Sequence, residues 1–261
     1  MIDIIIPAYN AHKTIEQTLI SLSFQTIKDK LNVIIVDDNS DMGYDDIVNK
    51  FKKILNIKIY KNNTNMGAGY SRQKGLEKSN SKYIMFIDSD DLLYSFNSIE
   101  KIYDIIIKGY DYLDSYSINE CNNNRYINEG DLHGKIYLRE FLEKNKICFN
   151  NSRYHEDNAF NSIVLLNEPK RARFNGITYL YCDNIDSLTK KERENEFYRL
   201  KIYIENMRYV LNETSKCNNN LVEKYVDTKY NYLFNYCNSL EKEKKELINN
   251  WLQENEFEKL F

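Results

Sequence analysis

The sequence predicts an α/β protein, with a doubly wound, mostly parallel sheet flanked by helices and a C-terminal helical appendage. Two observations predict this class. Through the first 90 residues, short apolar runs alternate with segments of helical periodicity, which is the order of parallel strands joined by helices. From about residue 190 onward, glycine and proline are absent and charged residues alternate with apolar ones, as in amphipathic helices.

The N-terminal half accounts for the parallel sheet. Four strands are expected from short apolar runs: Ile2–Ile6, Leu31–Val36, Ile57–Tyr60 and Lys82–Ile87. Three helices are expected between them: Thr14–Phe24, Ile47–Leu55 and Gly67–Ser79. Pro7 is expected to end the first strand. Runs of this kind are typical of strands that are buried on both faces.

The middle of the chain, from about residue 95 to 190, has a mixed pattern. We expect the following elements in order: a helix at Ser98–Lys108, a strand at Tyr112–Ile118, short helices near 135–144 and 157–166, and a strand at Arg173–Cys182. We therefore expect a domain at 1–190, made of a nucleotide-binding half (1–95) and an acceptor half (96–190), and a helical extension at 191–261.

Composition and charge narrow the function class. The chain of 261 residues has a formal charge of −3, without the basic excess that is usual for a protein that grips nucleic acid through its phosphates. Five cysteines are scattered and never spaced as CxxC, which argues against structural zinc and favours reduced thiols. No run of 18 apolar residues and no signal peptide is evident. We therefore expect a cytoplasmic protein without an integral membrane segment.

Polar residues follow three of the predicted strands: Pro7–Asn10, Asp37–Asp41 and Asp88–Asp91. In open parallel sheets, ligands collect in the crevice beyond the carboxyl ends of the strands. We therefore expect these three segments to converge on one crevice.

The sharpest signal in this crevice is the cluster Asp88, Ser89, Asp90 and Asp91, directly after an apolar strand. Carboxylates are ligands that Mg²⁺ and Mn²⁺ prefer, and such an ion bridges a protein to diphosphate oxygens and stabilises their charge. The alternative is an acidic turn that caps the following helix. The other two strand ends favour the metal site.

Two further motifs fit a nucleotide. Asp38 is suited to accept a hydrogen bond from a base N–H, or else caps the next helix. Gly67 and Gly69 precede a helix, where backbone N–H groups bind phosphate, although a tight turn explains a GxG equally well. Arg72, one turn into that helix, is placed to reach a base or a phosphate.

Taken together, these segments resemble family 2 of the inverting glycosyltransferases, which have the GT-A fold. The resemblance covers about the first 95 residues, and a thinner match follows from 130 to 190. The segments that carry it are Ile4–Asn10, Thr18–Leu22, Gln25-Thr26, Val36–Ser40, Asn65–Leu76 and Phe86–Asp91, then Gly134–Tyr137, Phe141-Leu142, Glu156-Asp157, Tyr181 and Ser187–Thr189.

The resemblance implies a role for each matching position. It implies that the backbone at Pro7, Ala8 and Tyr9 holds a uracil or another base together with Asp38, with Arg72 nearby. It implies that Asp88 binds the donor ribose beside Ser89, that Asp90 binds Mn²⁺ or Mg²⁺, and that Asp91 completes the cluster. It implies that Asp157 is the general base, because inversion needs a carboxylate to deprotonate the acceptor hydroxyl.

Three alternatives remain open around the implied base. Asp157 can also be read as a carboxylate that is favoured by the helix dipole at a helix start. Glu156 is the substitute base or an acceptor-orienting group. His155 is either a third metal ligand or a plain loop residue, and we assign no role to His12 and His133.

One position departs from the family. Many relatives carry Arg or His shortly after the position of Tyr181, in a loop that closes on the diphosphate, whereas Cys182-Asp183-Asn184 follows here. Either Lys190 or Lys191 supplies the charge, or the metal alone binds the diphosphate.

The expected function is transfer of a sugar, most simply from a UDP-hexose, to an acceptor hydroxyl on a glycan, a lipid-linked carrier or another molecule in surface glycan synthesis. The alternatives are a module that binds nucleotide without turnover and a nucleotidyltransferase. The helical tail is expected to pack on the catalytic domain, with homodimerisation or peripheral docking at the inner face of the membrane as alternatives.

Overall fold

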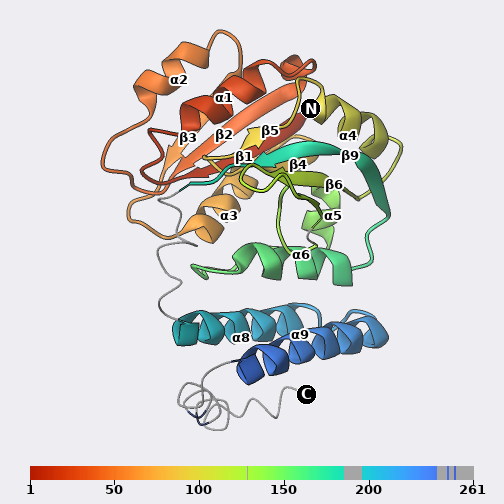
Figure 1. Cartoon of the computed structure of the whole chain (residues 1–261). Coiled ribbons are helices and arrows are strands. Elements are labelled where there is room, and N and C mark those ends of the chain that lie inside the picture. Colours follow the sequence, from red (N-terminus) through yellow and green to blue (C-terminus); the bar gives the residue numbers. More distant parts are fainter. Residues whose placement is uncertain (128, 185–195, 240–245, 247–249, 251–261) are drawn as a thin grey trace.

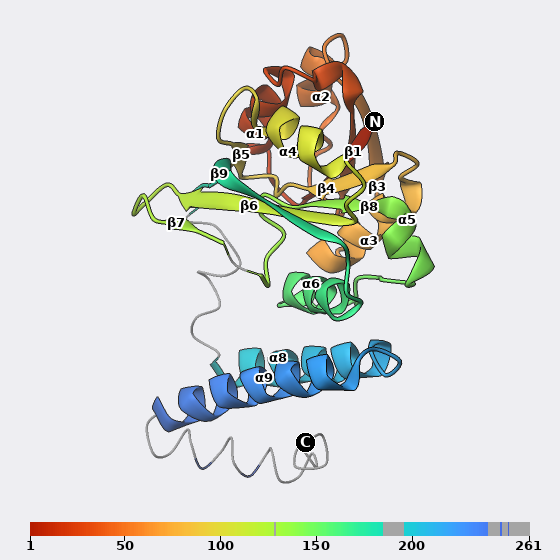
Figure 2. The ribbon, with the colours of Figure 1, turned by 90° about the vertical axis from the view of Figure 1, so that its right-hand side faces the viewer.

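The computed structural model describes residues 1–127, 129–184, 196–239, 246 and 250. Within these residues one nine-stranded sheet lies between two helical layers (Figure 1). Helices α1, α2 and α4 cover one face, and α3, α5 and α6 cover the other. Two long helices, α8 and α9, lie side by side beyond α6 (Figures 1 and 2).

The strands are β1 (Ile2–Ala8), β2 (Leu31–Asp37), β3 (Asn56–Lys61), β4 (Tyr83–Phe86), β5 (Leu92–Leu93), β6 (Tyr112–Asn119), β7 (Arg125–Tyr126), β8 (Ile136–Leu138) and β9 (Arg171–Tyr181). The helices are α1 (Ile15–Ser23), η1 (Lys28–Lys30), α2 (Asp45–Phe51), α3 (Ala68–Lys78), α4 (Ser98–Ile106), α5 (Arg139–Lys144), α6 (Glu156–Leu166), α8 (Glu196–Glu213) and α9 (Asn219–Ser239).

The strand order is β3-β2-β1-β4-β8-β6-β9-β5, with β7 paired to β6. The first four strands are parallel, which confirms the predicted doubly wound half. Strand β8 then runs antiparallel between β4 and β6, and β9 lies parallel to β6. The mixed second half therefore extends the parallel sheet rather than forming a separate one.

The prediction of a helix over 135–144 was wrong in its first part. Ile136–Leu138 is strand β8, and the helix begins only at Arg139. Successive side chains of a strand point to opposite faces, and here Ile136 enters the core cluster of the α4 face while Tyr137 enters that of the α6 face. The first strand also continues through Pro7 to Ala8, where Pro7 lies opposite Val36.

The C-terminal helices extend the core, as predicted for the tail. Val210 of α8 is fully buried in the cluster that contains Phe160 and Val164 of α6. Asn206 of α8 donates to the carbonyl of Tyr154 at 2.8 Å. No helix among the described residues is long and apolar enough to cross a membrane. The domain boundary expected near 190 and most of the expected extension beyond residue 239 lie outside the described residues.

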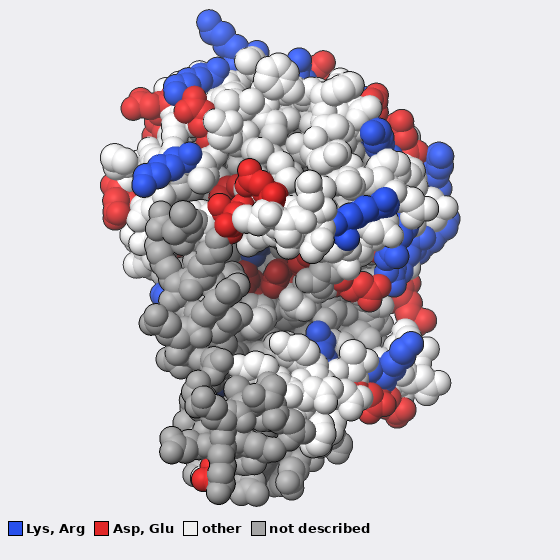
Figure 3. All heavy atoms as spheres, in the orientation of Figure 1, with Lys and Arg blue, Asp and Glu red and all other residues white. Residues whose placement is uncertain are grey.

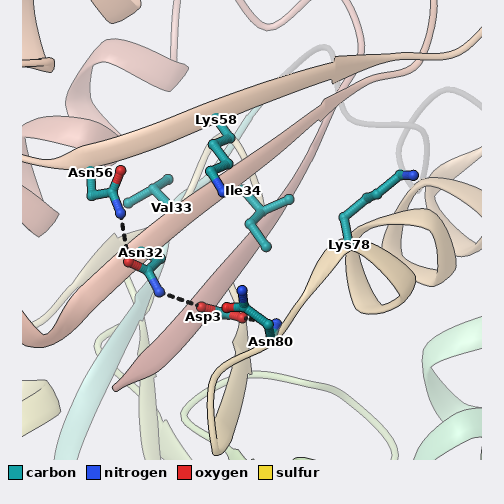
Figure 4. Close-up of a pocket in the computed structure, with 8 residues that line it drawn as sticks. All are labelled: Asp3, Asn32, Val33, Ile34, Asn56, Lys58, Lys78 and Asn80. Atoms are coloured by element: carbon teal, nitrogen blue, oxygen red, sulfur yellow. Dashed lines mark hydrogen bonds between the residues drawn. The ribbon is translucent and has the colours of Figure 1, made fainter.

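A polar ladder joins the starts of three strands at the sheet edge opposite their carboxyl ends (Figure 4). Asn56 donates to Asn32, and Asn32 donates to Asp3. The fully buried Asp3 also accepts from the backbone N–H of Asn80 and Ser81. Burial alone would raise the pKa of Asp3, but its hydrogen bonds, first those from the hydroxyls of Ser79 and Ser81, lower it. The carboxylate therefore fixes the turn between α3 and β4.

Candidate active site

The ends of the central strands meet as predicted. Ala8 of β1 lies opposite Asp37 of β2, and the Asp38 N–H donates to the Ala8 carbonyl at 2.8 Å. On the other side of β1, the Ile87 N–H donates to the Ile5 carbonyl at 3.1 Å. Asp38 and Asp88 therefore emerge from strands that flank β1. In the orientation of Figure 1, acidic side chains gather around a recess in the middle of the molecular surface (Figure 3).

Asp38 organises the turn before α3. Its side chain is 3% exposed and accepts from the N–H groups of Met66 and Gly67, at 2.9 and 2.7 Å. Asn62 Nδ2 donates to the same carboxylate at 2.7 Å. The backbone N–H groups of Met66 and Gly67 therefore already bind Asp38, which favours a tight turn as the reason for Gly67 and Gly69. The base-binding role of Asp38 stays a prediction.

The two glycines of this turn have different uses. Gly67 has φ +91°, a conformation that favours glycine. Gly69 lies so close to α6 that a Cβ atom there would meet the carbonyl of Asn150 and the side chain of Glu156, each at 2.8 Å. The absence of a side chain at Gly69 lets the start of α6 approach α3.

Arg72 joins the two acidic parts of the site. Its Nη1 donates to Glu156 and its Nη2 donates to Asp88, both at 2.6 Å. Burial disfavours the charged guanidinium, but the two carboxylates outweigh it and raise the pKa of Arg72. The same pairing lowers the pKa of Asp88 against the effect of burial. Within the described residues, Arg72 Nε has no hydrogen-bond partner. Arg72 thus holds the carboxylates of Asp88 and Glu156 in place, and its predicted role near the base stays a prediction.

Asp91 anchors the acidic turn to β9. Its side chain is 1% exposed. The Tyr179 hydroxyl donates to Asp91 Oδ2 at 2.7 Å, and the Cys182 N–H donates to Oδ1 at 2.8 Å. Tyr179 also accepts from the Asp88 N–H at 3.2 Å. Burial is the main cause that raises the pKa of Asp91 to about 8. Both Asp91 oxygens are engaged with β9 and the residue after it, which gives this carboxyl a positioning role.

Asp90 and Ser89 occupy the partly exposed rim of the cluster. Asn184 Nδ2 donates to Asp90 Oδ2 at 2.9 Å. Burial and the charge of Asp88 raise the pKa of Asp90. Negative charge at this rim is therefore incompletely balanced, which is the environment that a divalent cation relieves. Lys190 and Lys191, expected to supply charge here, and Ser187–Thr189 of the matching loop lie outside the described residues.

His133 completes the cluster. Its Nε2 lies 3.7 Å from both Asp88 Oδ2 and Asp91 Oδ2, and its ring stacks on Tyr179 with centroids 4.6 Å apart. Ligand atoms of Asp88, Asp91 and His133 lie within 4.8 Å of one another. Burial lowers the pKa of His133, but hydrogen bonding to Asp88 and the surrounding carboxylates outweigh it and raise the pKa to about 9.

The raised pKa of His133 leads us to expect a loss of stability in alkaline solution. Because its pKa rises from 6.5 to about 9 on folding, its stabilisation is complete below pH 6.5 and is lost as the pH passes through 9. With a chelator present, we expect the free energy of unfolding in urea to fall by about 2 kcal/mol between those pH values. A His133→Gln variant should show a shallower fall, and an equal fall in both proteins would contradict the assignment.

Asp157 and Glu156 begin α6, as predicted. Glu156 is buried against Arg72, and burial is the main cause that raises its pKa to about 7. Asp157 is partly exposed, and its Oδ1 accepts from the Asn158 N–H at 2.7 Å. His155 adopts φ +57° before the helix, and its ring lies against Tyr203 at 5.4 Å. Of these two carboxylates, Asp157 is the more accessible to an acceptor.

Sequence reasoning missed His133 and Tyr179, and it considered His155 as the additional metal ligand. The structure instead places His133 beside Asp88 and Asp91. No spacing rule singles out His133, because it lies more than 40 residues from the acidic turn. Its only signal was its place directly before the segment Gly134–Tyr137, which carried part of the family resemblance.

A protein-family model covers most of the residues of this site. The model of glycosyl transferase family 2 matches residues 3–168, which include the strand-end motifs, Arg72, His133 and the start of α6. The chain belongs to glycosyl transferase family 2. The sheet, its flanking helices and the C-terminal helices also match the GT-A fold of a solved member of this kind, described next.

The names of two relatives state an activity. The poly(ribitol-phosphate) beta-N-acetylglucosaminyltransferase TarS of Staphylococcus aureus is 36% identical over 92 residues, which are 34% of this chain and 16% of TarS. The UDP-Glc:alpha-D-GlcNAc-diphosphoundecaprenol beta-1,3-glucosyltransferase WfaP of Escherichia coli is 43% identical over 91 residues, which are 35% of this chain and 36% of WfaP. The matches thus span about a third of this chain, and they cover less than two thirds of the length of either relative.

Two solved structures share the fold. TarS residues 1–349 in complex with UDP-GlcNAc superpose with a TM-score of 0.80 at 20% identity, covering 96% of this chain and 79% of that chain. The mannosyltransferase PcManGT of Pyrobaculum calidifontis, in complex with GDP-Man and Mn²⁺, gives a TM-score of 0.59 at 14% identity, covering 81% and 64%. The TarS match extends the shared fold to most of this chain.

Proposed function

We propose that the chain is an inverting glycosyltransferase that moves a sugar from a UDP-sugar to an acceptor hydroxyl with the help of Mn²⁺ or Mg²⁺. One observation carries this proposal. Arg72 holds Asp88, which follows the donor-side strand, and Glu156, which adjoins Asp157, at 2.6 Å each. This pairing supports the proposal, because it joins the carboxylate proposed for the donor to the helix start that carries Asp157, at the carboxyl ends of the strands where ligands of such sheets collect.

The relatives support the substrate classes. TarS has been solved with UDP-GlcNAc, and the name of WfaP states a UDP-Glc donor and a diphosphoundecaprenol-linked acceptor. We therefore favour a UDP-hexose or UDP-N-acetylhexosamine donor. We favour an acceptor that is a surface glycan or its lipid-linked precursor, which would place the reaction on the cytoplasmic side of a membrane.

The residues present fit a divalent ion. Asp90 would be its principal ligand. Asp88 and a deprotonated His133, which have ligand atoms within 4.8 Å of each other, would contribute further ligands, whereas Asp91 already uses both oxygens on Tyr179 of β9 and Cys182. A bound Mn²⁺ or Mg²⁺ would neutralise charge on the departing diphosphate. Mn²⁺ in PcManGT supports this assignment.

In this proposal the chain itself supplies three functions. The backbone at Pro7–Tyr9 and Asp38 orient the base, while Asp88 and Ser89 orient the ribose. Glu156, held by Arg72, keeps the start of α6 in place. Asp157 accepts the proton of the acceptor hydroxyl as that oxygen attacks the anomeric carbon from the face opposite the diphosphate.

The test has two stages. Calorimetry with UDP, with and without Mn²⁺, measures donor binding, and a UDP-release assay with UDP-glucose and UDP-N-acetylglucosamine measures turnover. We expect binding that is tighter with Mn²⁺, followed by release of UDP. Binding without hydrolysis or transfer, across a broad panel of donors and acceptors, would instead identify a nucleotide-binding module. Pyrophosphate release from UTP and a sugar phosphate would identify a nucleotidyltransferase.

Asp90→Asn should separate metal binding from folding. The substitution keeps the shape of the side chain but removes the charge that attracts the cation, so we expect Mn²⁺ to no longer tighten UDP binding and turnover to fall at least about 100-fold. Asp104→Asn, which changes an exposed acidic residue of α4, is the control and should behave as the unmodified protein. Retention of Mn²⁺-stimulated turnover by Asp90→Asn would reject Asp90 as the ligand.

A further inference from the structure

We propose that Asn206 of α8 is a positioning residue for the reaction: it holds the segment 150–154, and through it the first turn of α6, where Asp157 can serve as the base. This inference rests on the proposed function, because that function makes Asp157 the base. It assigns a part in the reaction to a helix that lies outside the family match, which ends at residue 168.

The segment 150–154 leads into α6 but belongs to no helix or strand itself. Its last residue, Tyr154, is followed by His155, which has φ +57°, and then by Glu156 and Asp157 in the first turn of α6. A residue other than glycine keeps this left-handed conformation only where its surroundings fix it. The direction in which α6 leaves the segment therefore depends on the contacts that hold the peptide between Tyr154 and His155.

Asn206 supplies such contacts from α8, and its side chain is 4% exposed. The N–H groups of its Nδ2 are shared among three acceptors: the Tyr154 carbonyl at 2.8 Å, the Ile202 carbonyl at 3.0 Å and Ser152 Oγ at 3.2 Å. Its Oδ1 accepts from Asn150 Nδ2. Ser152 Oγ itself donates to the Tyr154 carbonyl at 2.9 Å. One buried amide thus contacts three residues of the segment while it stays bonded to its own helix.

Helix α3 also contacts the segment and the start of α6. A Cβ atom at Gly69 would meet the Asn150 carbonyl at 2.8 Å, so the segment lies directly against the first turn of α3. Arg72, one turn further along α3, donates to Glu156 at 2.6 Å. The chain that carries the base is therefore held by α3, through Gly69 and Arg72, and by α8, through Asn206.

Packing alone does not explain an amide at this position of α8. The neighbouring buried side chains of the helix are apolar: Ile202, Ile204, Met207 and Val210. Removing an amide from water costs free energy unless its donors and its acceptor are bonded, and an apolar side chain would fill the space without that cost. The hydrogen bonds of Asn206 therefore select one arrangement of the segment.

Asn206→Leu in the full chain should lower the turnover number about 10- to 100-fold, because a displacement of the base by about 1 Å has an effect of that size. The partners of Asn206 lie in the segment and in α8, so the affinity for UDP with Mn²⁺ and the KM for the UDP-sugar should stay within about twofold. Calorimetry with UDP measures binding, and UDP release from UDP-glucose or UDP-N-acetylglucosamine measures turnover. Hydrogen exchange followed by mass spectrometry should be about tenfold faster or more at 150–158.

Val210→Ala is the matched control. Val210 lies one turn further along α8 and is fully buried in the cluster that contains Phe160 and Val164 of α6. Its truncation weakens the packing of α8 on α6 but removes no bond to the segment. We expect a lower melting temperature, with turnover within about twofold of the unmodified protein and unchanged exchange at 150–158. Equal losses of turnover in Asn206→Leu and Val210→Ala would overturn the inference, because packing of α8 would then account for both.

Ser152→Ala keeps the inference testable if Asn206→Leu does not fold. Ser152 is partly exposed, and its hydroxyl contacts both Asn206 and the Tyr154 carbonyl. We expect about threefold lower turnover and faster exchange at 150–158, and no change in either would overturn the inference. A protein that neither binds nor hydrolyses any UDP-sugar would instead overturn the proposed function, and the exchange rates would still show whether Asn206 holds the segment.

Discussion

The Asp157→Asn protein should bind UDP and Mn²⁺ normally and lose transfer by about 100- to 10,000-fold. Asparagine has the shape of aspartate, but its amide cannot accept the proton of the acceptor hydroxyl. Asp157 is partly exposed at the start of α6, so the change buries no new group and should leave the fold intact. Calorimetry with UDP and initial rates of UDP release with a saturating acceptor measure the two effects separately.

Asn158→Asp provides the matched comparison for the base. It moves a carboxylate to the next position of the same helical turn, so it should not restore activity when combined with Asp157→Asn. A turnover number within about threefold of the unmodified protein for Asp157→Asn alone would exclude Asp157 as the base. Glu156 would then be the candidate base, because its pKa is raised to about 7, close to the value that suits proton transfer at neutral pH.

Arg72→Met should reduce the free energy of unfolding by about 3 to 5 kcal/mol, the usual cost of breaking a buried ion pair from one side. The substitution keeps an unbranched apolar stem but leaves Glu156 buried and Asp88 half-buried without their cation. Urea denaturation measures the loss. We also expect turnover to fall, because the start of α6 is no longer fixed to α3. Arg72→Lys should recover only part of both effects, since one ammonium replaces a guanidinium that contacts two carboxylates.

A double variant distinguishes charge from packing at this position. Adding Glu156→Gln to Arg72→Met removes one of the two uncompensated carboxylates, so the double variant should be more stable than Arg72→Met alone. If the double variant is less stable by the sum of the two single losses, the two side chains act independently. That result would reject the ion pair as the reason for the destabilisation.

Much of the donor-binding half could be predicted from the sequence, because its strands and helices follow one another in short, regular segments of the chain. Apolar runs and helical periodicity predicted β1 to β4 and α1 to α3, and parallel pairing then requires their polar ends to meet. The helix expected near 157–166 is α6, which begins one residue earlier at Glu156. Strand β8 was missed, because three residues are too few for an alternating pattern and helix Arg139–Lys144 follows without a break.

The roles of individual side chains were harder to predict, because they depend on long-range contacts. Arg72 was expected to face a base or a phosphate, but it bridges residues 16 and 84 positions away. His133 and Tyr179 reach Asp88 and Asp91 only because β6, β8 and β9 extend the sheet. In each case the local sequence fixes the residue type but not its partner.

The attachment of the acidic turn to β9 has a consequence for the order of folding. The turn from Asp88 to Asp91 is translated early, yet its hydrogen bonds to Tyr179 and Cys182 span 88 and 91 residues. Contacts of such separation form late, because a long loop must close first. A nascent chain that has not yet exposed β9 outside the ribosome therefore holds three adjacent or nearly adjacent aspartates without these partners. A fragment ending at residue 168, where the family match ends, would lack both partners of Asp91.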